Sequence, residues 1–163
     1  MKHIIKFKIL LLFLITVSCN KTDSSSLTEK EIVHLKSDIL KRGSQSSYAR
    51  LDNYYRNSAN YIEILPYSMV MTNRFNSNYS YTRILEVIIK MNNEGKYKLS
   101  DIEKLNKGDR DFVIYYLMKG IDQGDSESIK ILSELYKYGW GVSKNLKKSD
   151  SLYSNYENIM WGR

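Results

Sequence analysis

The sequence predicts an all-α fold, a short α-solenoid of antiparallel helix pairs with about seven to eight helices. Apolar residues recur with the helical period from residue 27 onward, and no segment alternates convincingly with period two. Residues four apart share one helix face, so a small, an aliphatic and an aromatic residue at that spacing behind a glycine predict a buried seam. The pattern occurs twice, as Gly43, Ser47, Leu51 and Tyr55 and as Gly124, Ser128, Leu132 and Tyr136.

The first helix pair begins at a predicted capping box. Thr28 followed by Glu31 can satisfy the free backbone amides of a helix start. Gly43 suits the end of this helix, because glycine tolerates a positive φ. The second helix is expected from about Ser44 to Arg56 and carries the upstream seam.

The rest of the chain predicts helices at regular intervals. Apolar residues keep helical spacing over 61–75, where Pro66 is expected to open the helix because proline has no amide hydrogen to donate. A fourth helix is expected around 81–88, and a second capping box of Ser100 and Glu103 predicts a brief fifth one. The last three helices are expected at 109–123, 125–138 and about 145–160.

The final third of the chain carries a loop with two glycines, Gly139 and Gly141. The surrounding pattern is Tyr136-x-x-Gly139-x-Gly141-Val142-x-x-Asn145-x-x-Lys148-Ser149-x-x-Leu152-Tyr153. This pattern resembles the Sel-one-like repeats, which are close relatives of the tetratricopeptide repeats. The resemblance covers about residues 109–156 and implies stacked helix pairs. Ser133 departs from the family, which usually has glycine there.

Four regions follow from these patterns. Residues 1–18 are predicted to form a signal peptide. Residues 19–26 are predicted to form a polar tether, because this stretch is short and serine-rich. Residues 27–105 are only tetratricopeptide-like, because they carry the seam without the glycine loop. Residues 106–163 form the Sel-one-like region.

The first 18 residues have the composition of an export signal. Lys2, Lys6 and Lys8 precede the apolar run 9–15, which is well short of the roughly 20 residues needed to span a bilayer. Thr16-Val17-Ser18-Cys19 then resembles the lipobox of bacterial lipoproteins, which implies acylation of Cys19. That family prefers leucine where Thr16 stands, so cleavage by the ordinary signal peptidase, or no cleavage, stays open.

Export sets the expected charge and location of the mature chain. Removal of residues 1–18 takes away three lysines and no acid, so the formal charge falls from +7 to +4. Asn20, not an acid, follows Cys19, which favours the outer membrane, with the periplasmic or surface face left open. Lys144, Lys147 and Lys148 make the densest basic run without an aromatic-basic motif, so no nucleic-acid partner is expected.

The mature sequence offers few groups for catalysis. His34 is its one histidine and Cys19 the one cysteine of the chain, so neither a usual zinc set nor a histidine-centred nucleophile is expected. The Gly139-x-Gly141 loop follows no predicted strand, so no nucleotide is expected to bind there. We therefore expect no enzyme activity, cofactor or metal, although two distant acids of the glycosidase type stay open.

Two functional classes follow. The first is a membrane-tethered protein–protein interaction module of the bacterial cell envelope, in a narrower version an immunity protein that neutralises a toxin. The second is an enzyme acting on cell-wall glycan or peptide, or an accessory subunit of one. Exposed residues of the inner helices are the expected partner surface of the first class. These are Arg50, Asn53 and Tyr54 on the second helix, and Lys130, Glu134 and Lys137 on the 125–138 helix.

Overall fold

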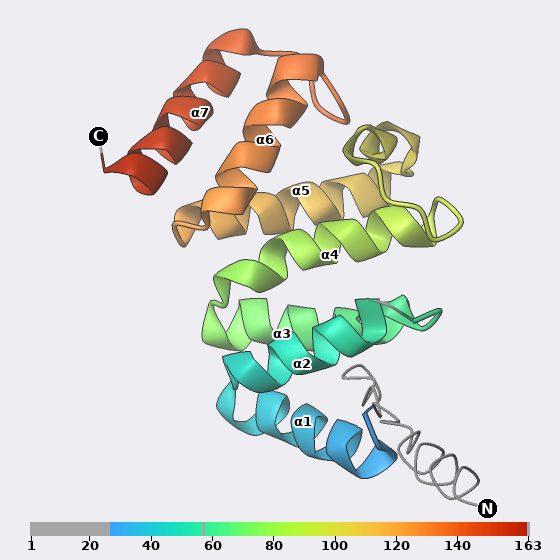
Figure 1. The fold of residues 1–163 in the computed structure, drawn as a ribbon. Helices are drawn as coiled ribbons and strands as arrows, with labels where there is room; N and C mark the ends of the chain where they lie inside the picture. The colour runs from blue at the N-terminus through green and yellow to red at the C-terminus, as the bar shows by residue number, and fades with distance from the viewer. Residues whose placement is uncertain (1–26, 57, 163) are drawn as a thin grey trace, which may run out of the picture.

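A computed structural model describes residues 27–56 and 58–162, and this part of the chain is entirely helical (Figure 1). It contains seven α-helices and two 3-10 segments, and no strand occurs within these ranges. The predicted all-α fold class is thus confirmed. The predicted signal peptide, the tether and Cys19 lie outside the described residues.

The first two helices are α1 (Glu29–Arg42) and α2 (Gln45–Arg56). The predicted capping box is present, because Thr28 Oγ1 accepts a hydrogen bond from the Glu31 amide at 3.3 Å and Glu31 Oε2 accepts one from the Thr28 amide at 2.9 Å. Helix α1 ends at Gly43, which has the left-handed backbone expected of it (φ 63°).

The middle helices are α3 (Leu65–Phe75) and α4 (Asn78–Met91), preceded by a 3-10 turn, η1 (Tyr61–Ile64). Pro66 lies in the first turn of α3, as predicted, where its missing amide hydrogen costs no helical hydrogen bond.

The predicted brief fifth helix forms, but as a 3-10 helix and not as an α-helix. Residues 99–104 form a 3-10 segment, η2 (Leu99–Lys104), and the expected capping box of Ser100 and Glu103 does not form. Its backbone bonds span three residues, from the Asp101 amide to the Lys98 carbonyl at 2.9 Å. The tighter turn turns Ile102 inward, and this side chain is fully buried.

The last three helices are α5 (Lys107–Asp122), α6 (Ser126–Tyr138) and α7 (Leu146–Trp161). Each begins at a side chain that accepts a backbone amide hydrogen at about 3 Å, as expected of asparagine and aspartate at a helix start. The three capping residues are Asn106, Asp125 and Asn145.

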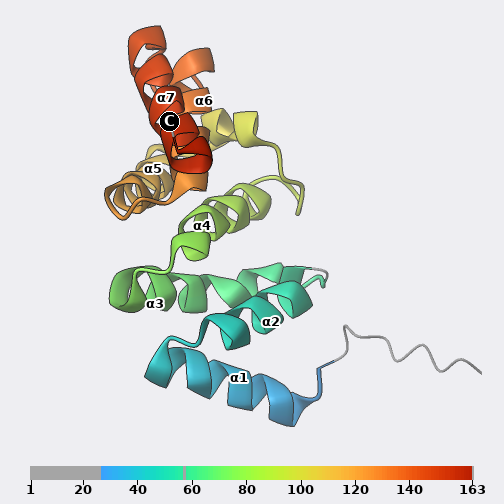
Figure 2. The same ribbon diagram turned by 60° about the vertical axis from the view of Figure 1, so that its left-hand side comes forward.

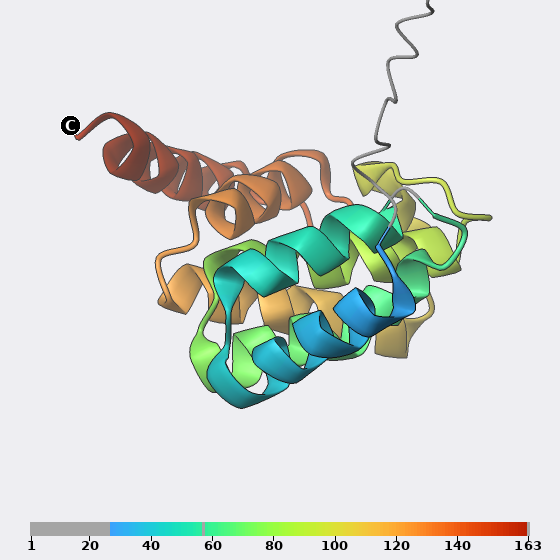
Figure 3. The same cartoon turned by 60° about the horizontal axis from the view of Figure 1, so that its bottom comes forward.

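The helices stack in chain order from α1 at one end to α7 at the other (Figures 1 and 2). Besides its neighbour in sequence, α1 packs on α3, and α4 packs on α6. Figure 3 shows α1 on one side, with α2 and α6 on the other. The C-terminus of α7 therefore lies far from the start of α1.

Two hydrophobic clusters fill the stack, one around α1–α3 and one around α4–α6. Each contains one copy of the predicted seam. Tyr136 is only partly buried. The structure buries the other five side chains, which are Ser47, Leu51, Tyr55, Ser128 and Leu132.

Alanine substitution of the two seam glycines should lower the free energy of unfolding by different amounts. Both have a positive φ, 63° at Gly43 and 75° at Gly124, and alanine in that conformation costs roughly 1–2 kcal/mol. A Cβ at Gly43 would also overlap the Phe75 ring, whereas one at Gly124 would meet no atom within 4 Å. We expect Gly43→Ala to lower the free energy of unfolding by at least about 1 kcal/mol more than Gly124→Ala, measured by urea titration. Equal losses would contradict this difference in packing.

Candidate partner-binding site

A cleft of about 430 Å³ lies between α6 and α7. Both helices and the turn that joins them supply its walls. The lining side chains are Ser133, Glu134, Lys137, Tyr138, Trp140, Ser149, Asp150 and Tyr153.

The small side chains Ser133 and Ser149 let the two helices approach closely beside this cleft. Ser133 Oγ donates a hydrogen bond to the Ser149 carbonyl oxygen at 3.0 Å, and both residues are buried. Neither serine side chain extends far from its helix, so the α6 and α7 backbones can come close at this contact. The two walls are therefore fixed to each other by helix packing.

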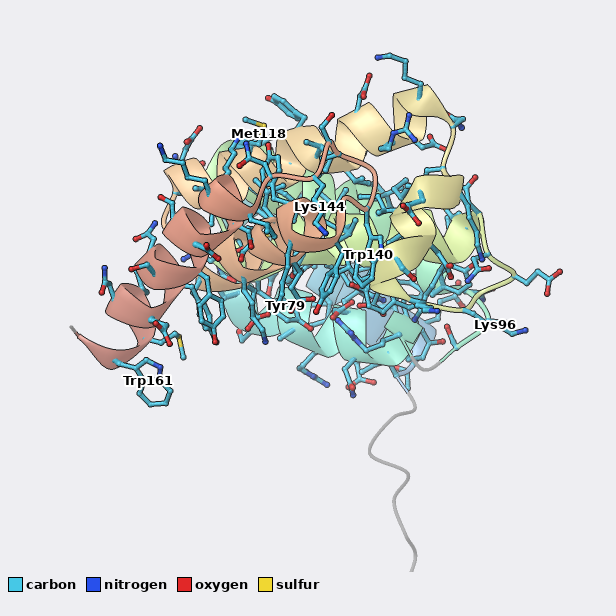
Figure 4. All side chains as sticks on the ribbon, turned by 90° about the horizontal axis from the view of Figure 1, so that it is seen from above. Tyr79, Lys96, Met118, Trp140, Lys144 and Trp161 are labelled. Atoms are coloured by element: carbon cyan, nitrogen blue, oxygen red, sulfur yellow. The ribbon has the colours of Figure 1, made fainter. Side chains whose placement is uncertain are left out.

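Two stacked aromatic rings form one side of the cleft. The Tyr138 and Trp140 ring centroids lie 4.5 Å apart with an interplanar angle of 24°. Gly139 between them has a left-handed backbone, and the amides of Gly139 and Trp140 both donate to the Leu135 carbonyl, at 2.8 and 3.1 Å. The left-handed backbone at Gly139 reverses the direction of the chain, and the Trp140 indole therefore lies back against the last turn of α6. Figure 4 shows Trp140 and Tyr79 on one side of the molecule, with Met118 at the other edge.

Two carboxylates line opposite walls of the cleft. Glu134 belongs to α6 and Asp150 to α7. Within residues 27–56 and 58–162, neither forms an ion pair with a basic side chain, although eleven such pairs occur there. The ammonium group of Lys137 lies 5.3 Å from the Tyr138 ring centroid.

A buried ion cluster connects α2 to α4 farther along the stack. The Arg83 side chain is fully buried, and its Nε lies 2.5 Å from Asp52 Oδ1 while its Nη1 lies 2.7 Å from Glu86 Oε1. Arg56 completes the ring, with nitrogens 2.9 Å from Asp52 and 2.8 Å from Glu86. Tyr79 donates a hydrogen bond to Asp52 at 2.9 Å. Asp52 and Arg83 are buried charges, and such charges are tolerated only because each has a partner of opposite sign.

The surroundings of this cluster shift several pKa values. Burial raises the pKa of Glu86, but the hydrogen bond from Lys90 and the charge of Arg83 outweigh burial and leave it lowered. Burial raises the pKa of Asp125, which faces the cluster across a cavity of about 410 Å³. Burial, together with nearby acids on α4 and α6, raises the pKa of Tyr97 to about 12. The paired charges fit a structural role in this region better than a chemical one.

The structure separates the six predicted surface residues. Glu134 and Lys137 line the cleft together. Lys130 lies on the same helix with its ammonium group 5.8 Å from the Tyr156 ring centroid.

The three predicted residues on α2 lie away from the cleft. Arg50 forms an ion pair with Glu31 of α1 at 3.4 Å, and Asn53 is exposed. Tyr54 packs against the first hydrophobic cluster and forms an edge contact with Tyr55. Sequence reasoning missed Asp150 and Tyr153, because only the pairing of α6 with α7 brings them to Glu134.

The contacts of the described residues do not test the prediction that the chain has no catalytic groups. His34 is 72% exposed and lies 3.5 Å from Asp38, so it reads as a surface residue. Across the residues that the structure describes, no three histidine, cysteine or acidic side chains gather as metal ligands. In the same residues, no helix is both long and apolar enough to cross a bilayer.

Comparisons with protein-family models, with curated proteins and with solved structures give no significant match.

Proposed function

We propose that this chain is a membrane-tethered protein–protein interaction module of the bacterial cell envelope that binds its partner at the α6–α7 cleft. The observation that carries the proposal is the combination of a stacked Tyr138–Trp140 pair with two carboxylates that form no ion pair within residues 27–56 and 58–162. Aromatic anchors in a rigid pocket supply much of the binding energy in protein interfaces. The Sel-one-like resemblance supports the same proposal, because stacked helical repeats present extended binding surfaces.

The membrane tether is part of the proposal and rests on the sequence of the first 26 residues. The apolar run and Cys19 support export and acylation, with the outer membrane as the location. Metabolic labelling with a palmitate analogue tests this part. We expect label on the wild-type chain and none on Cys19→Ala, and persistent label on the variant would refute acylation at Cys19.

The narrower proposal is that the partner is a toxin and that this chain neutralises it. Deletion of the gene should then sensitise cells to an effector encoded next to it, and the wild-type gene should restore resistance. Cells that stay resistant to every neighbouring effector would count against this version and leave the general binding role standing.

The alternative function is an enzyme acting on cell-wall glycan or peptide, or an accessory subunit of one. Glu134 and Asp150 favour it, because a glycosidase needs two carboxyl groups on opposite sides of its substrate. Full-length chain purified in a non-ionic detergent can be incubated with peptidoglycan. We expect no release of soluble fragments. Release that disappears in Glu134→Gln would establish the enzyme and overturn the non-catalytic proposal.

A further inference from the structure

The charge of the α6–α7 cleft favours a cationic occupant. Among the described residues that line it, Glu134 and Asp150 are acidic and Lys137 is basic, which leaves one net negative charge. The two carboxylates come from different helices, so one cation between the walls can approach both. An anionic occupant would meet repulsion from both walls.

The aromatic side of the cleft is also suited to a cation. Lys137 already holds its ammonium group 5.3 Å from the Tyr138 ring centroid, and the other ring of the stack is an indole. Tryptophan is the strongest aromatic partner for a cation, and a planar guanidinium can stack on it while its edges donate hydrogen bonds.

We infer that the α6–α7 cleft receives an arginine side chain of the partner protein, stacked on Trp140 and paired with Glu134 and Asp150. The inference rests on the proposed binding function and names the chemistry by which the partner is recognised. Arginine fits better than lysine, because a guanidinium can donate to two carboxylates in different directions while its face lies on the indole. Arginine is also enriched among the residues that dominate interface energies.

The binding of short peptides to the detergent-purified full-length chain tests the inference. In a Trp161→Phe background Trp140 is the only tryptophan, and its indole N–H gives a single NMR signal. Trp161 is 69% exposed at the end of α7 and lies outside the cleft lining, so this background leaves the cleft intact. The probes are acetyl-Gly-X-Gly-amide peptides in which X is arginine, lysine or citrulline, the last being a neutral analogue of arginine.

We expect the arginine peptide to shift the Trp140 signal saturably and to bind at least about fivefold more tightly than the citrulline peptide, as loss of a charge interaction of about 1 kcal/mol implies. The lysine peptide should bind between the two. Glu134→Gln and Asp150→Asn should each weaken arginine binding by about threefold. Lys137→Gln should strengthen it, because that substitution removes the competing cation.

Asp122→Asn is the matched control, since Asp122 is exposed at the end of α5 and lies outside the cleft, so it should leave binding unchanged. The inference would be overturned if the chain with an unaltered cleft bound the arginine and citrulline peptides equally, or did not respond to the arginine peptide. A response to chitotetraose in place of arginine would overturn it in favour of a glycan. The peptide measurements do not test whether the cleft binds a protein in cells. The inference and the proposed function can therefore fail separately.

Discussion

Arg83→Met should lower the free energy of unfolding by about 3–5 kcal/mol, because it removes the fully buried cation that contacts the buried Asp52 carboxylate and the partly buried Glu86 carboxylate. The Arg83 side chain is fully buried, and it contacts Asp52 and Glu86 on two different helices. Urea unfolding measures the loss. The effect on stability should be among the largest of any single substitution in the chain, since breaking the cluster also loosens α2 from α4.

Two further variants separate the ion pair from the loss of side-chain volume. Asp52→Leu combined with Arg83→Met removes both charges, and we expect the double variant to lose less than the sum of the single losses by at least about 1 kcal/mol. Arg42→Met is the surface control, because Arg42 is 69% exposed in its pair with Asp38 and should cost at most about 1 kcal/mol. Additive losses in the double variant would show that Asp52 and Arg83 do not stabilise each other.

Leu51→Ala and Leu132→Ala should each lower the free energy of unfolding by about 2–5 kcal/mol, as truncation of a buried leucine does. The two leucines hold equivalent places in the repeated seam, at 0% and 2% exposure, one in each hydrophobic cluster. Similar losses measured by urea titration would support equal roles of the two copies as core.

Leu146→Ala is the control for this pair, because Leu146 is 53% exposed at the start of α7. We expect it to change stability by at most about 0.5 kcal/mol, the usual range for surface positions. If either seam variant were as mild as this control, the seam interpretation would be wrong for that copy.

Local signals explain why the helices could be predicted from the sequence. The capping box at Thr28, the glycine at 43 and the proline at 66 act within one helix turn, so their meaning does not depend on the rest of the fold. The helix at 99–104 forms as a 3-10 helix, and its predicted capping box was wrong because that prediction considered local residues alone. Ser100 and Glu103 match a capping box locally, but burial of Ile102 against the second cluster favours the tighter 3-10 turn.

Contacts between distant residues explain why the ion cluster and most of the cleft could not be predicted. Asp52 and Arg83 are 31 positions apart, and their pairing depends on how α2 packs on α4. Asp150 faces Glu134 only because Ser133 and Ser149 let α6 and α7 approach. The sequence indicated that Glu134 and Lys137 are exposed on one helix face. Helical periodicity assigns residues to a face of one helix, but it does not predict which residues of another helix lie opposite.

Site-specific photo-crosslinking in cells tests binding at the α6–α7 cleft most directly. The full-length chain carries a benzoylphenylalanine in place of Tyr153, which is 49% exposed in the cleft, or in place of Tyr115, which is 58% exposed on α5. We predict that irradiation joins one discrete envelope protein to the chain at position 153, that position 115 gives no such product, and that Trp140→Ala abolishes the product at 153. Equal products at both positions, or none at 153, would contradict a partner-binding role for this cleft.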